Sequence, residues 1–293
     1  MFFSSAQKRL CAASSDSVGS FSQMSTILFA SPVFGPVHSR RLGLSLGVNL
    51  LPADGKLCTF DCLYCECGLN DEHRPKTDMP TRALVAEKLE ERIRILAGEG
   101  RPVDAITFAG NGEPTMHPDF AAIVEDTIAI RDRLVPKAKL CVLTNSTNLL
   151  KPKVAEALKR FDLPMFKLDA LDADWVRRVN RPQCPYRQEA LIEALKGWEG
   201  QCIIQTMFLR GTADGVSVDN TTDDFVEPWL KVIADIRPKC VSIYSLDRDA
   251  SCTTLRKADP ERLLAIGERV KALGIPVQVS VKASEVRREK ECD

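Results

Sequence analysis

The sequence lacks a long apolar run, an excess of charge of either sign, and a second group of metal-binding residues. No apolar stretch approaches the roughly 20 residues that a membrane-spanning helix needs. The 40 basic and 40 acidic residues give a formal net charge of zero, which argues against nucleic-acid binding driven by overall charge. Aromatic residues make up 6% of the chain. We therefore expect no membrane association and little dedicated nucleic-acid-binding surface.

Cysteine, by contrast, is abundant, with 11 residues in 293. We find no secretory leader, so the sequence predicts a reducing, cytoplasmic location rather than a disulfide-rich secreted protein. Residues 1–23 contain seven serines and no sustained hydrophobic period. We expect them to be a disordered tail or an artefact of an upstream start codon, and residues 24–293 to form one domain.

Three of the cysteines, Cys58, Cys62 and Cys65, follow one another in the order C-x3-C-x2-C. A short loop with this spacing can place three thiolates around one face of a cubane iron–sulfur cluster, whose irons prefer sulfur ligands. A cubane held entirely by protein takes four cysteines, so three leave one iron open. The spacing therefore predicts a [4Fe–4S] cluster with a coordination position free for chemistry.

Other interpretations of the triad fit less well. Given the cysteine content, a random match to this spacing has a chance of about one in seventy. A structural zinc site usually needs a second C-x2-C or H-x3-H pair, and the sequence contains none. The remaining cysteines are too scattered for a disulfide framework. Cys67 is a possible competing ligand, but a thiol two residues after Cys65 is expected to point away.

Short apolar runs alternate with amphipathic segments along the rest of the chain. Strands are predicted over residues 45–50, 105–108, 140–143, 165–168, 202–208, 241–244 and 277–281. Helices are predicted between them, the first capped by Thr81 and the third beginning at Pro152. This alternation implies parallel strands with right-handed crossovers. We therefore predict an α/β fold, an incomplete parallel (β/α)6 TIM-like barrel with an extra C-terminal strand.

Polar and glycine-rich residues follow several of these strands. Residues 110–114 follow the second strand, Asn145 the third, and Lys167 and Asp169 flank the end of the fourth. Tyr244, Ser245 and Arg248 follow the sixth. Taken singly, each is explained by a turn, a cap or a simple ion pair. Because ligands of parallel α/β proteins bind at the carboxyl ends of the strands, their shared position predicts a common site.

These residues resemble a known family. The cysteine motif, with Tyr64 before its last cysteine, resembles the signature of the radical S-adenosylmethionine (SAM) enzymes. Gly112 and Glu113 resemble the second and third residues of that family's Gly-Gly-Glu segment, with Asn111 in place of the first glycine. Residues 34–43, 45–47 and 167–170 resemble a subgroup, the iron–sulfur oxidoreductases similar to tRNA wyosine synthetases.

The resemblance implies a cofactor set and residue roles. Cys58, Cys62 and Cys65 would bind three irons of a [4Fe–4S] cluster, and SAM would chelate the fourth. The implied SAM contacts are Tyr64 at the adenine, Gly112 and Glu113 at the methionyl amino group, the backbone of Asn111 in place of the first glycine, and Asn145, Lys167 and Asp169 at the ribose or methionyl carboxylate. An electron from an external donor such as flavodoxin or ferredoxin would cleave SAM to methionine and a 5′-deoxyadenosyl radical.

The resemblance does not identify the substrate from which this radical would abstract hydrogen. One hypothesis is a nucleic acid such as tRNA. A second is a protein or small molecule, for instance when the enzyme is an activase. A third, of another class, is a non-catalytic iron–sulfur protein that transfers electrons, against which the open iron and the predicted SAM contacts argue.

Overall fold

An eight-stranded sheet organises the chain in the computed structural model, which describes residues 26–39, 42–247 and 252–281. The strands are paired in the order β1-β2-β3-β4-β5-β6-β9-β11. Only the β1–β2 pair is antiparallel in this sheet as described; the other six pairs are parallel. The strands are β1 (Val33–Ser39), β2 (Gly43–Val48), β3 (Ala105–Phe108), β4 (Lys139–Thr144), β5 (Leu163–Lys167), β6 (Ile203–Met207), β9 (Cys240–Tyr244) and β11 (Val277–Val279).

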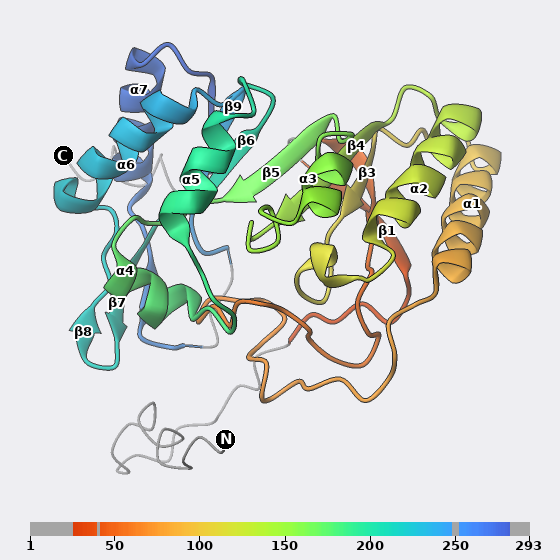
Figure 1. Cartoon of the computed structure of the whole chain (residues 1–293), viewed down its shortest axis with the longest axis horizontal. Helices are drawn as coiled ribbons and strands as arrows, with labels where there is room; N and C mark the ends of the chain where they lie inside the picture. Colours follow the sequence, from red (N-terminus) through yellow and green to blue (C-terminus); the bar gives the residue numbers. More distant parts are fainter. Residues whose placement is uncertain (1–25, 40–41, 248–251, 282–293) are drawn as a thin grey trace, which may run out of the picture.

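A helix lies between each parallel strand and the next parallel strand of this sheet. These helices are α1 (Arg82–Gly98), α2 (Phe120–Leu134), α3 (Pro152–Leu158), α5 (Gln188–Lys196), α6 (Asp223–Ile236) and α7 (Pro260–Ala272). They lie around the outside of the curved sheet (Figure 1). The edge strands β1 and β11 do not pair with each other within the described residues. The predicted incomplete barrel of six strand–helix units with a C-terminal extra strand is therefore confirmed.

Helix α1 shows how local sequence sets these elements. The Thr81 hydroxyl accepts a hydrogen bond from the Leu84 amide at 3.2 Å and caps the helix. Its buried residues, Val85, Leu89, Ile93 and Leu96, recur at the helical period and face the sheet. Just beyond its end, Gly100 adopts a φ of +68°, which residues with a side chain adopt at a cost.

Side-chain alternation divides the parallel strands into two faces. Leu46, Val48, Ile106 and Phe108 point outward and form the main core with the helices. Their neighbours point into the barrel. Near the amino ends of the strands, the interior is filled by a small cluster of apolar side chains around Cys141, Met165 and Ile203. The inward-facing polar residues Thr144, Gln205 and Tyr244 lie toward the opposite end, where the cysteine loop lies.

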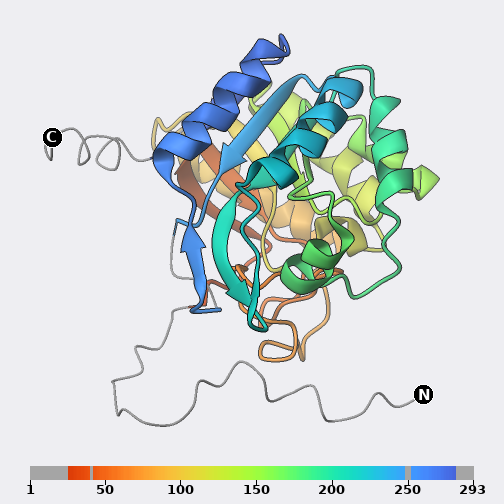
Figure 2. The same ribbon diagram turned by 90° about the vertical axis from the view of Figure 1, so that its left-hand side faces the viewer.

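Several elements are absent from the sequence-based prediction. They are the antiparallel strand β1, the short helix α4 (Ala173–Trp175) with the π-helical turn Val176–Asn180, and a second sheet of β7 (Leu209–Ala213), β8 (Val216–Ser217) and β10 (Leu255–Lys257). The second sheet extends toward the same end of the molecule as the cysteine-containing segment, drawn in orange (Figures 1 and 2).

Some predicted boundaries also need correction. The fourth predicted strand runs from Leu163 to Lys167 rather than over 165–168, although the Leu168 amide still donates to the Gln205 carbonyl of β6 at 3.0 Å. The helix predicted over 186–198 is shorter, Gln188–Lys196. The predicted tail over residues 1–23 and Arg248 lie outside the described residues. None of the helices that the described residues form has the length and apolarity needed to cross a bilayer.

Candidate active site

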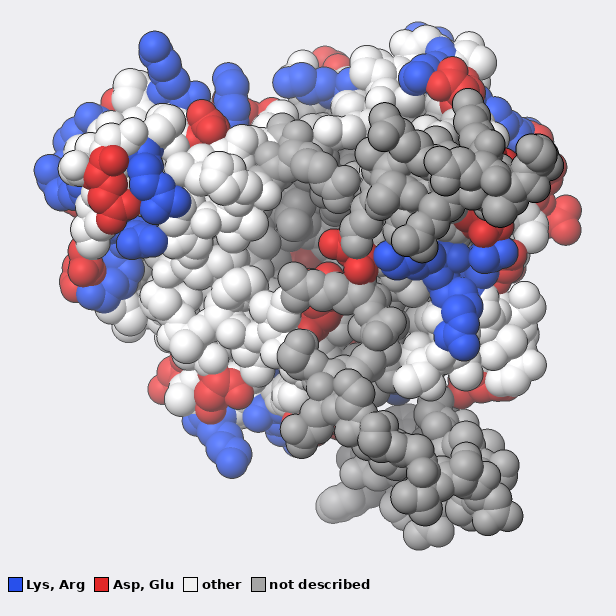
Figure 3. Space-filling model, turned by 180° about the vertical axis from the view of Figure 1, so that it is seen from behind, with Lys and Arg blue, Asp and Glu red and all other residues white. Residues whose placement is uncertain are grey.

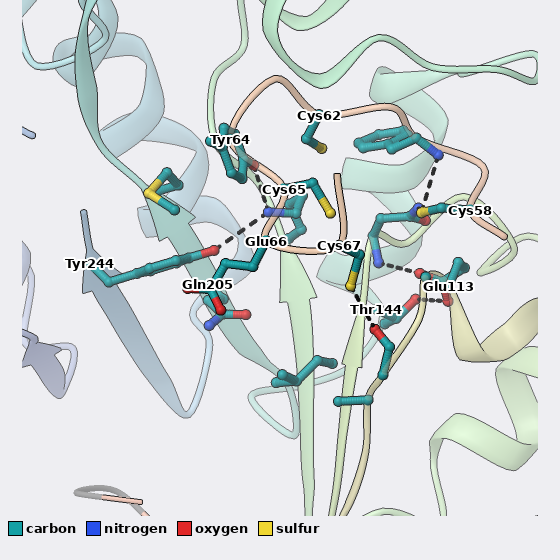
Figure 4. A pocket seen from close by; sticks show the side chains of 18 of the residues that line it. Cys58, Cys62, Tyr64, Cys65, Glu66, Cys67, Glu113, Thr144, Gln205 and Tyr244 are labelled. Carbon is teal, nitrogen blue, oxygen red and sulfur yellow. Dashed lines mark hydrogen bonds between the residues drawn. The ribbon is translucent and has the colours of Figure 1, made fainter. Parts of the chain in front are cut away.

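A cavity of about 370 Å³ opens at the carboxyl ends of β3, β4, β5, β6 and β9. The sulfur atoms of Cys58, Cys62 and Cys65 face a common space within it (Figure 4). The cavity is lined by Cys58, Phe60, Cys62, Tyr64, Cys65, Glu66, Cys67, Ala109, Gly110, Gly112, Glu113, Leu143, Thr144, Asn145, Lys167, Gln205, Met207, Tyr244, Ser245, Leu246 and Asp247. The predicted convergence of the cysteine loop with several strand ends is thus observed.

Buried polar groups hold the cysteine loop in shape. The Lys56 ammonium, whose side chain is 1% exposed, donates to the Gly68 carbonyl at 2.8 Å and lies 3.4 Å from the Asp61 carboxylate. Asp61 also accepts from the Asn70 amide at 2.8 Å, and the Asn70 side chain donates to the Cys58 carbonyl at 3.2 Å. These bonds close the loop, because Lys56 and Asp61 near its beginning bind Gly68 and Asn70 near its end.

A second segment supports the loop from outside. The π-helical turn Val176–Asn180 and the residues after it run alongside the loop, where the Asp61 and Leu63 amides donate to the Asn180 and Val179 carbonyls at 3.0 and 2.9 Å. The Asn180 side chain donates to the Asp169 carboxylate at 2.9 Å and to the Cys62 sulfur at 3.6 Å. The turn therefore fixes both the backbone of the loop and one of its sulfurs.

Hydrogen-bond donors are directed at the cysteine sulfurs. The Phe60 amide and the Asn145 side chain donate to the Cys58 sulfur at 3.4 and 3.6 Å. The Cys67 side chain, which also lies 3.4 Å from the Gly110 carbonyl, lowers the pKa of Cys65 to about 6 by hydrogen bonding, despite the opposing effect of burial. Burial raises the pKa of Cys62 to about 11. Cys65 is therefore poised as a thiolate at neutral pH, whereas Cys62 keeps its proton until a cation binds.

Residues 110–113 are joined to the cysteine loop through the backbone. The Leu57 amide donates to the Asn111 carbonyl at 2.9 Å, and the Glu113 amide donates to the Leu57 carbonyl at 3.2 Å. Gly112 adopts a φ of +139°, and a Cβ there would overlap the Leu57 carbonyl. Only glycine permits this close approach of the two backbones.

Glu113 is 2% exposed, and its carboxylate accepts four hydrogen bonds. Two of them come from the Thr144 hydroxyl and the Asn145 amide, both at 2.7 Å, and the other two from Thr115. Burial raises the pKa of this carboxyl group, and the hydrogen bonds oppose that rise. The network fixes a carboxylate at the wall of the cavity and links the ends of β3 and β4.

On the opposite wall, Lys167 is at the centre of a buried network. Its ammonium donates to the Tyr64 hydroxyl at 2.8 Å and to the Tyr244 hydroxyl at 3.5 Å, and lies 3.4 Å from Asp169. Tyr64 in turn donates to the Asp169 carboxylate. Burial alone would lower the pKa of Lys167, but Asp169, Tyr244 and Cys62 together outweigh it, and the pKa is raised. Lys167 is therefore a permanent cation at neutral pH.

Comparison with known proteins identifies the family. The sequence model of the "Radical SAM superfamily" matches residues 54–215, more than half of the chain. The chain belongs to the radical SAM superfamily. It is also 30% identical over 248 residues to a UPF0026 protein of Helicobacter pylori, a match that covers 79% of this chain and 71% of that protein.

Solved structures of other radical SAM enzymes share the fold. A radical SAM methyltransferase from Sphaerobacter thermophilus superposes on 80% of the chain with a TM-score of 0.60 and 18% identity. SuiB of Streptococcus suis bound to S-adenosylmethionine superposes on 80% with a TM-score of 0.57 and 16% identity. The chain spans 65% and 51% of these two proteins. The protein is thus a radical SAM enzyme with a partial barrel, in a superfamily that uses SAM and usually a [4Fe–4S] cluster.

The cavity has a donor set that fits such a cluster. Each thiolate of a cubane binds a different iron, so the three sulfurs must surround the cluster rather than converge on one point. Among the described residues, no three His, Cys, Asp or Glu side chains are placed to hold a single metal ion. That finding does not support the alternative of a zinc site, whereas three sulfurs facing one cavity with amide donors directed at them suit a cluster.

Most of the sequence-predicted SAM contacts of this radical SAM enzyme line the cavity: Tyr64, Gly112, Glu113, Asn145 and Lys167. Asn111 and Asp169 do not. The Asn111 side chain points away and binds the backbone of Phe29 and Pro52. The Asp169 side chain is fully buried behind Tyr64. The geometry therefore gives no support to direct SAM contacts from these two side chains.

Sequence reasoning missed Asn180 and Gln205. Gln205 faces the cavity from the middle of β6, where the alternation of that strand marks it as the inward-facing polar residue. Asn180 lies in a five-residue turn that follows no helical or strand period, so no pattern in the sequence indicates it.

Proposed function

We propose that Cys58, Cys62 and Cys65 bind a [4Fe–4S] cluster and that the enzyme cleaves SAM there to begin a hydrogen abstraction. When bound and reduced, this cluster supplies the electron that splits SAM into methionine and a 5′-deoxyadenosyl radical. The observation that carries the proposal is the set of three sulfurs facing one cavity, each approached by a hydrogen-bond donor. No fourth cysteine completes the motif, which leaves the fourth iron for SAM.

The charges of the cavity suit the methionyl end of SAM. Its ammonium group needs acceptors, which the buried Glu113 carboxylate and the neighbouring backbone provide. Its carboxylate needs a cation, and Lys167 keeps its proton because Asp169 lies beside it. Asn145 adds an amide between the two walls, held in place by the Thr59 hydroxyl at 2.8 Å. Two opposite charges on facing walls would orient a zwitterion across the cavity.

The remaining lining would protect a reactive radical. Phe60, Leu143, Met207 and Leu246 are apolar and line the same cavity. A cavity of this kind excludes water and prevents side reactions. The electron would come from an external donor, such as a flavodoxin or ferredoxin. The side chain of Glu66, next to Cys65, is exposed, so such a partner can approach the cysteine loop from this side.

Anaerobic reconstitution tests the proposal. The full chain should bind about four irons and, with SAM and a strong reductant, form 5′-deoxyadenosine, measured by liquid chromatography. Alanine at Cys58, Cys62 or Cys65 should abolish both iron binding and 5′-deoxyadenosine formation.

Cys67→Ala and Cys141→Ala serve as controls and should keep the iron, since the Cys67 sulfur lies at the Gly110 carbonyl and Cys141 fills the barrel interior. Stoichiometric zinc without iron would contradict the cluster assignment. A complete cluster that never yields 5′-deoxyadenosine would favour an electron-transfer protein instead.

A further inference from the structure

A second cavity, of about 590 Å³, adjoins the first one inside the barrel. The two share the residues Glu66, Cys67, Ala109, Gly110 and Leu143. Its full lining is Ile27, Phe29, Phe34, Val37, Leu42, Ser45, Gly47, Glu66, Cys67, Thr107, Ala109, Gly110, Leu143 and Met165. Because the proposed SAM cavity and this one share a wall, a molecule in the second lies next to the place where the radical would form.

One side of the second cavity is the inner face of β2 to β5. Ser45 and Thr107 line it from neighbouring strands and bind each other through their hydroxyl groups at 2.8 Å. This bond satisfies much of the hydrogen-bonding capacity of the two hydroxyl groups. Leu143 and Met165 complete this side with apolar groups. This side, the floor of the cavity, is therefore largely apolar.

The other side consists of the segment that precedes β2. The Phe29 and Phe34 rings stack with centroids 3.5 Å apart, and the Phe34 ring covers Gly47, where any Cβ would overlap it. This close contact explains glycine at position 47. Two aromatic rings thus form a rigid apolar wall opposite the strands.

Asn111 and Asn49 hold this wall in place. The Asn111 side chain accepts a hydrogen bond from the Phe29 amide at 2.8 Å and donates to the Phe29 carbonyl at 3.0 Å. Asn49 donates to the same carbonyl at 3.2 Å, and the Ile27 amide donates to the Glu66 carbonyl at 2.9 Å. The asparagine that departs from the Gly-Gly-Glu pattern therefore anchors the wall of the second cavity.

The charge of the second cavity restricts what it can hold. Of its lining residues in the described part of the chain, Glu66 alone carries a full charge, and that charge is negative. A phosphate or carboxylate placed there would lose its hydration without gaining a cation. Seen from behind, the described surface shows a broad uncharged area, with Lys and Arg among Asp and Glu around it (Figure 3). The described lining of the cavity therefore favours an uncharged apolar occupant.

We infer that the second cavity binds the group whose C–H bond the enzyme attacks, and that this group is an uncharged aromatic or branched aliphatic one. This inference rests on the proposed function. The transferred hydrogen atom carries one electron, so 5′-deoxyadenosine and a carbon radical of the bound group form without any further oxidant. Anionic parts of the substrate remain outside the cavity.

Binding of a neutral probe tests the inference in the full chain. Ligand-observed NMR titration should show that indole binds in the millimolar range expected for so small a molecule. Indole-3-carboxylate should bind at least tenfold more weakly, since its negative charge meets Glu66 and finds no cation among the described lining residues. Met165→Trp fills the cavity from the floor and Val37→Trp fills it from the edge, and each should raise the dissociation constant of indole at least tenfold.

A matched control is available on the β7–β8 hairpin. Val37 is 50% exposed and Val216 is 44% exposed, so a tryptophan should be tolerated at either position, but Val216 does not line the cavity. Val216→Trp should bind indole as the wild type does. Unchanged binding in both cavity variants, or equal affinity for the carboxylate, would overturn the inference. Displacement of indole by a short single-stranded RNA would support the inference and identify the bound group as a nucleic-acid base.

The titration needs neither SAM nor reductant. A failure to form 5′-deoxyadenosine would therefore refute the proposed function and leave the indole result unchanged, so the two hypotheses fail separately.

Discussion

Asn180 connects three groups that the site depends on. Its amide donates to the Asp169 carboxylate at 2.9 Å, to the Tyr64 hydroxyl at 3.0 Å and to the Cys62 sulfur at 3.6 Å. All three partners are buried. The side-chain amide has two donor hydrogens, which the three acceptors share. Asn180 therefore sets the position of the cysteine loop relative to the Lys167 network.

We expect Asn180→Ala to destabilise the protein by about 1–3 kcal/mol, because buried acceptors lose their donor. In the iron-loaded protein the same change should make the reduction potential of the cluster more negative, since hydrogen bonds to sulfur stabilise the reduced state. Chemical denaturation and a spectroscopic redox titration measure the two effects.

The exposed side chain of Gln183, three residues further on, provides the control. It donates to the Arg181 carbonyl and reaches none of these groups, so Gln183→Ala should change neither quantity. An unchanged potential in Asn180→Ala together with lost stability would reduce Asn180 to a purely structural residue.

The sequence identifies site residues well where a motif fixes their spacing. The cysteines, Tyr64, Gly112 and Glu113 all belong to such motifs and all line one cavity. The sequence identifies site residues poorly where the direction of a side chain determines whether it reaches the cavity. Asp169 follows the end of β5 by two residues, but its carboxylate is buried behind Tyr64, where it also accepts a hydrogen bond from the Met207 amide. Asn111 lies within a motif and yet binds the backbone on its other side.

At the scale of elements, a charge cluster joins the two helices α1 and α2. Glu90 of α1 accepts hydrogen bonds from Arg133 of α2 and from Arg94, both at 2.6 Å. Arg133, followed by Arg94, lowers the pKa of Glu90 to about 2 from an ordinary value of 4.5. A carboxyl group with a depressed pKa stabilises the fold above its unfolded pKa and loses that contribution as the pH falls.

The melting temperature of Glu90→Gln should therefore lie slightly below that of the wild type at pH 6, and the difference should shrink between pH 4.5 and pH 2. The effect should be small and should diminish at high salt, because the cluster is exposed. Glu87→Gln on the same helix, whose side chain lies 3.4 Å from Lys88, provides the control. A difference that grows toward low pH would contradict the assignment.

Elements with a clear hydrophobic period are those that the sequence predicts. The predicted stripe of α1 contains the same four residues that the structure buries, and β3 has its predicted bounds. Strand β1 contains Gly35 and Pro36, and β8 has two residues, so neither shows the period of a strand. The π-helical turn is likewise too short to carry one. These elements form because tertiary contacts, such as the pairing of β1 with β2, outweigh local preference.

At the scale of the whole molecule, the main core and the cysteine loop are separate units. The core between helices and sheet contains no residue of the loop, whose apolar side chains pack in a cluster of their own with Trp175, Val179 and Met207. We therefore expect removal of iron by a chelator to leave the barrel folded and to loosen mainly the loop and the turn Val176–Asn180.

Hydrogen exchange measured by mass spectrometry should show faster exchange over residues 57–70 and 176–183 after chelation, with α1, α2 and the parallel strands unchanged. Cys62→Ala should reproduce this pattern without a chelator. Cooperative loss of helical circular dichroism on chelation would show instead that the cluster is required for the entire fold.

The alternation of side chains along the parallel strands has an evolutionary consequence. Outward residues such as Ile106 and Phe108 are fixed by their packing against helices, while their immediate neighbours, such as Thr107, face the cavities. Substitutions on the inward face can therefore accumulate with little effect on the outward one. A few substitutions at the inward-facing positions, which are every second residue along a strand, can therefore change the substrate while the barrel stays the same. Relatives with a common barrel are expected to differ most at the residues that line its interior.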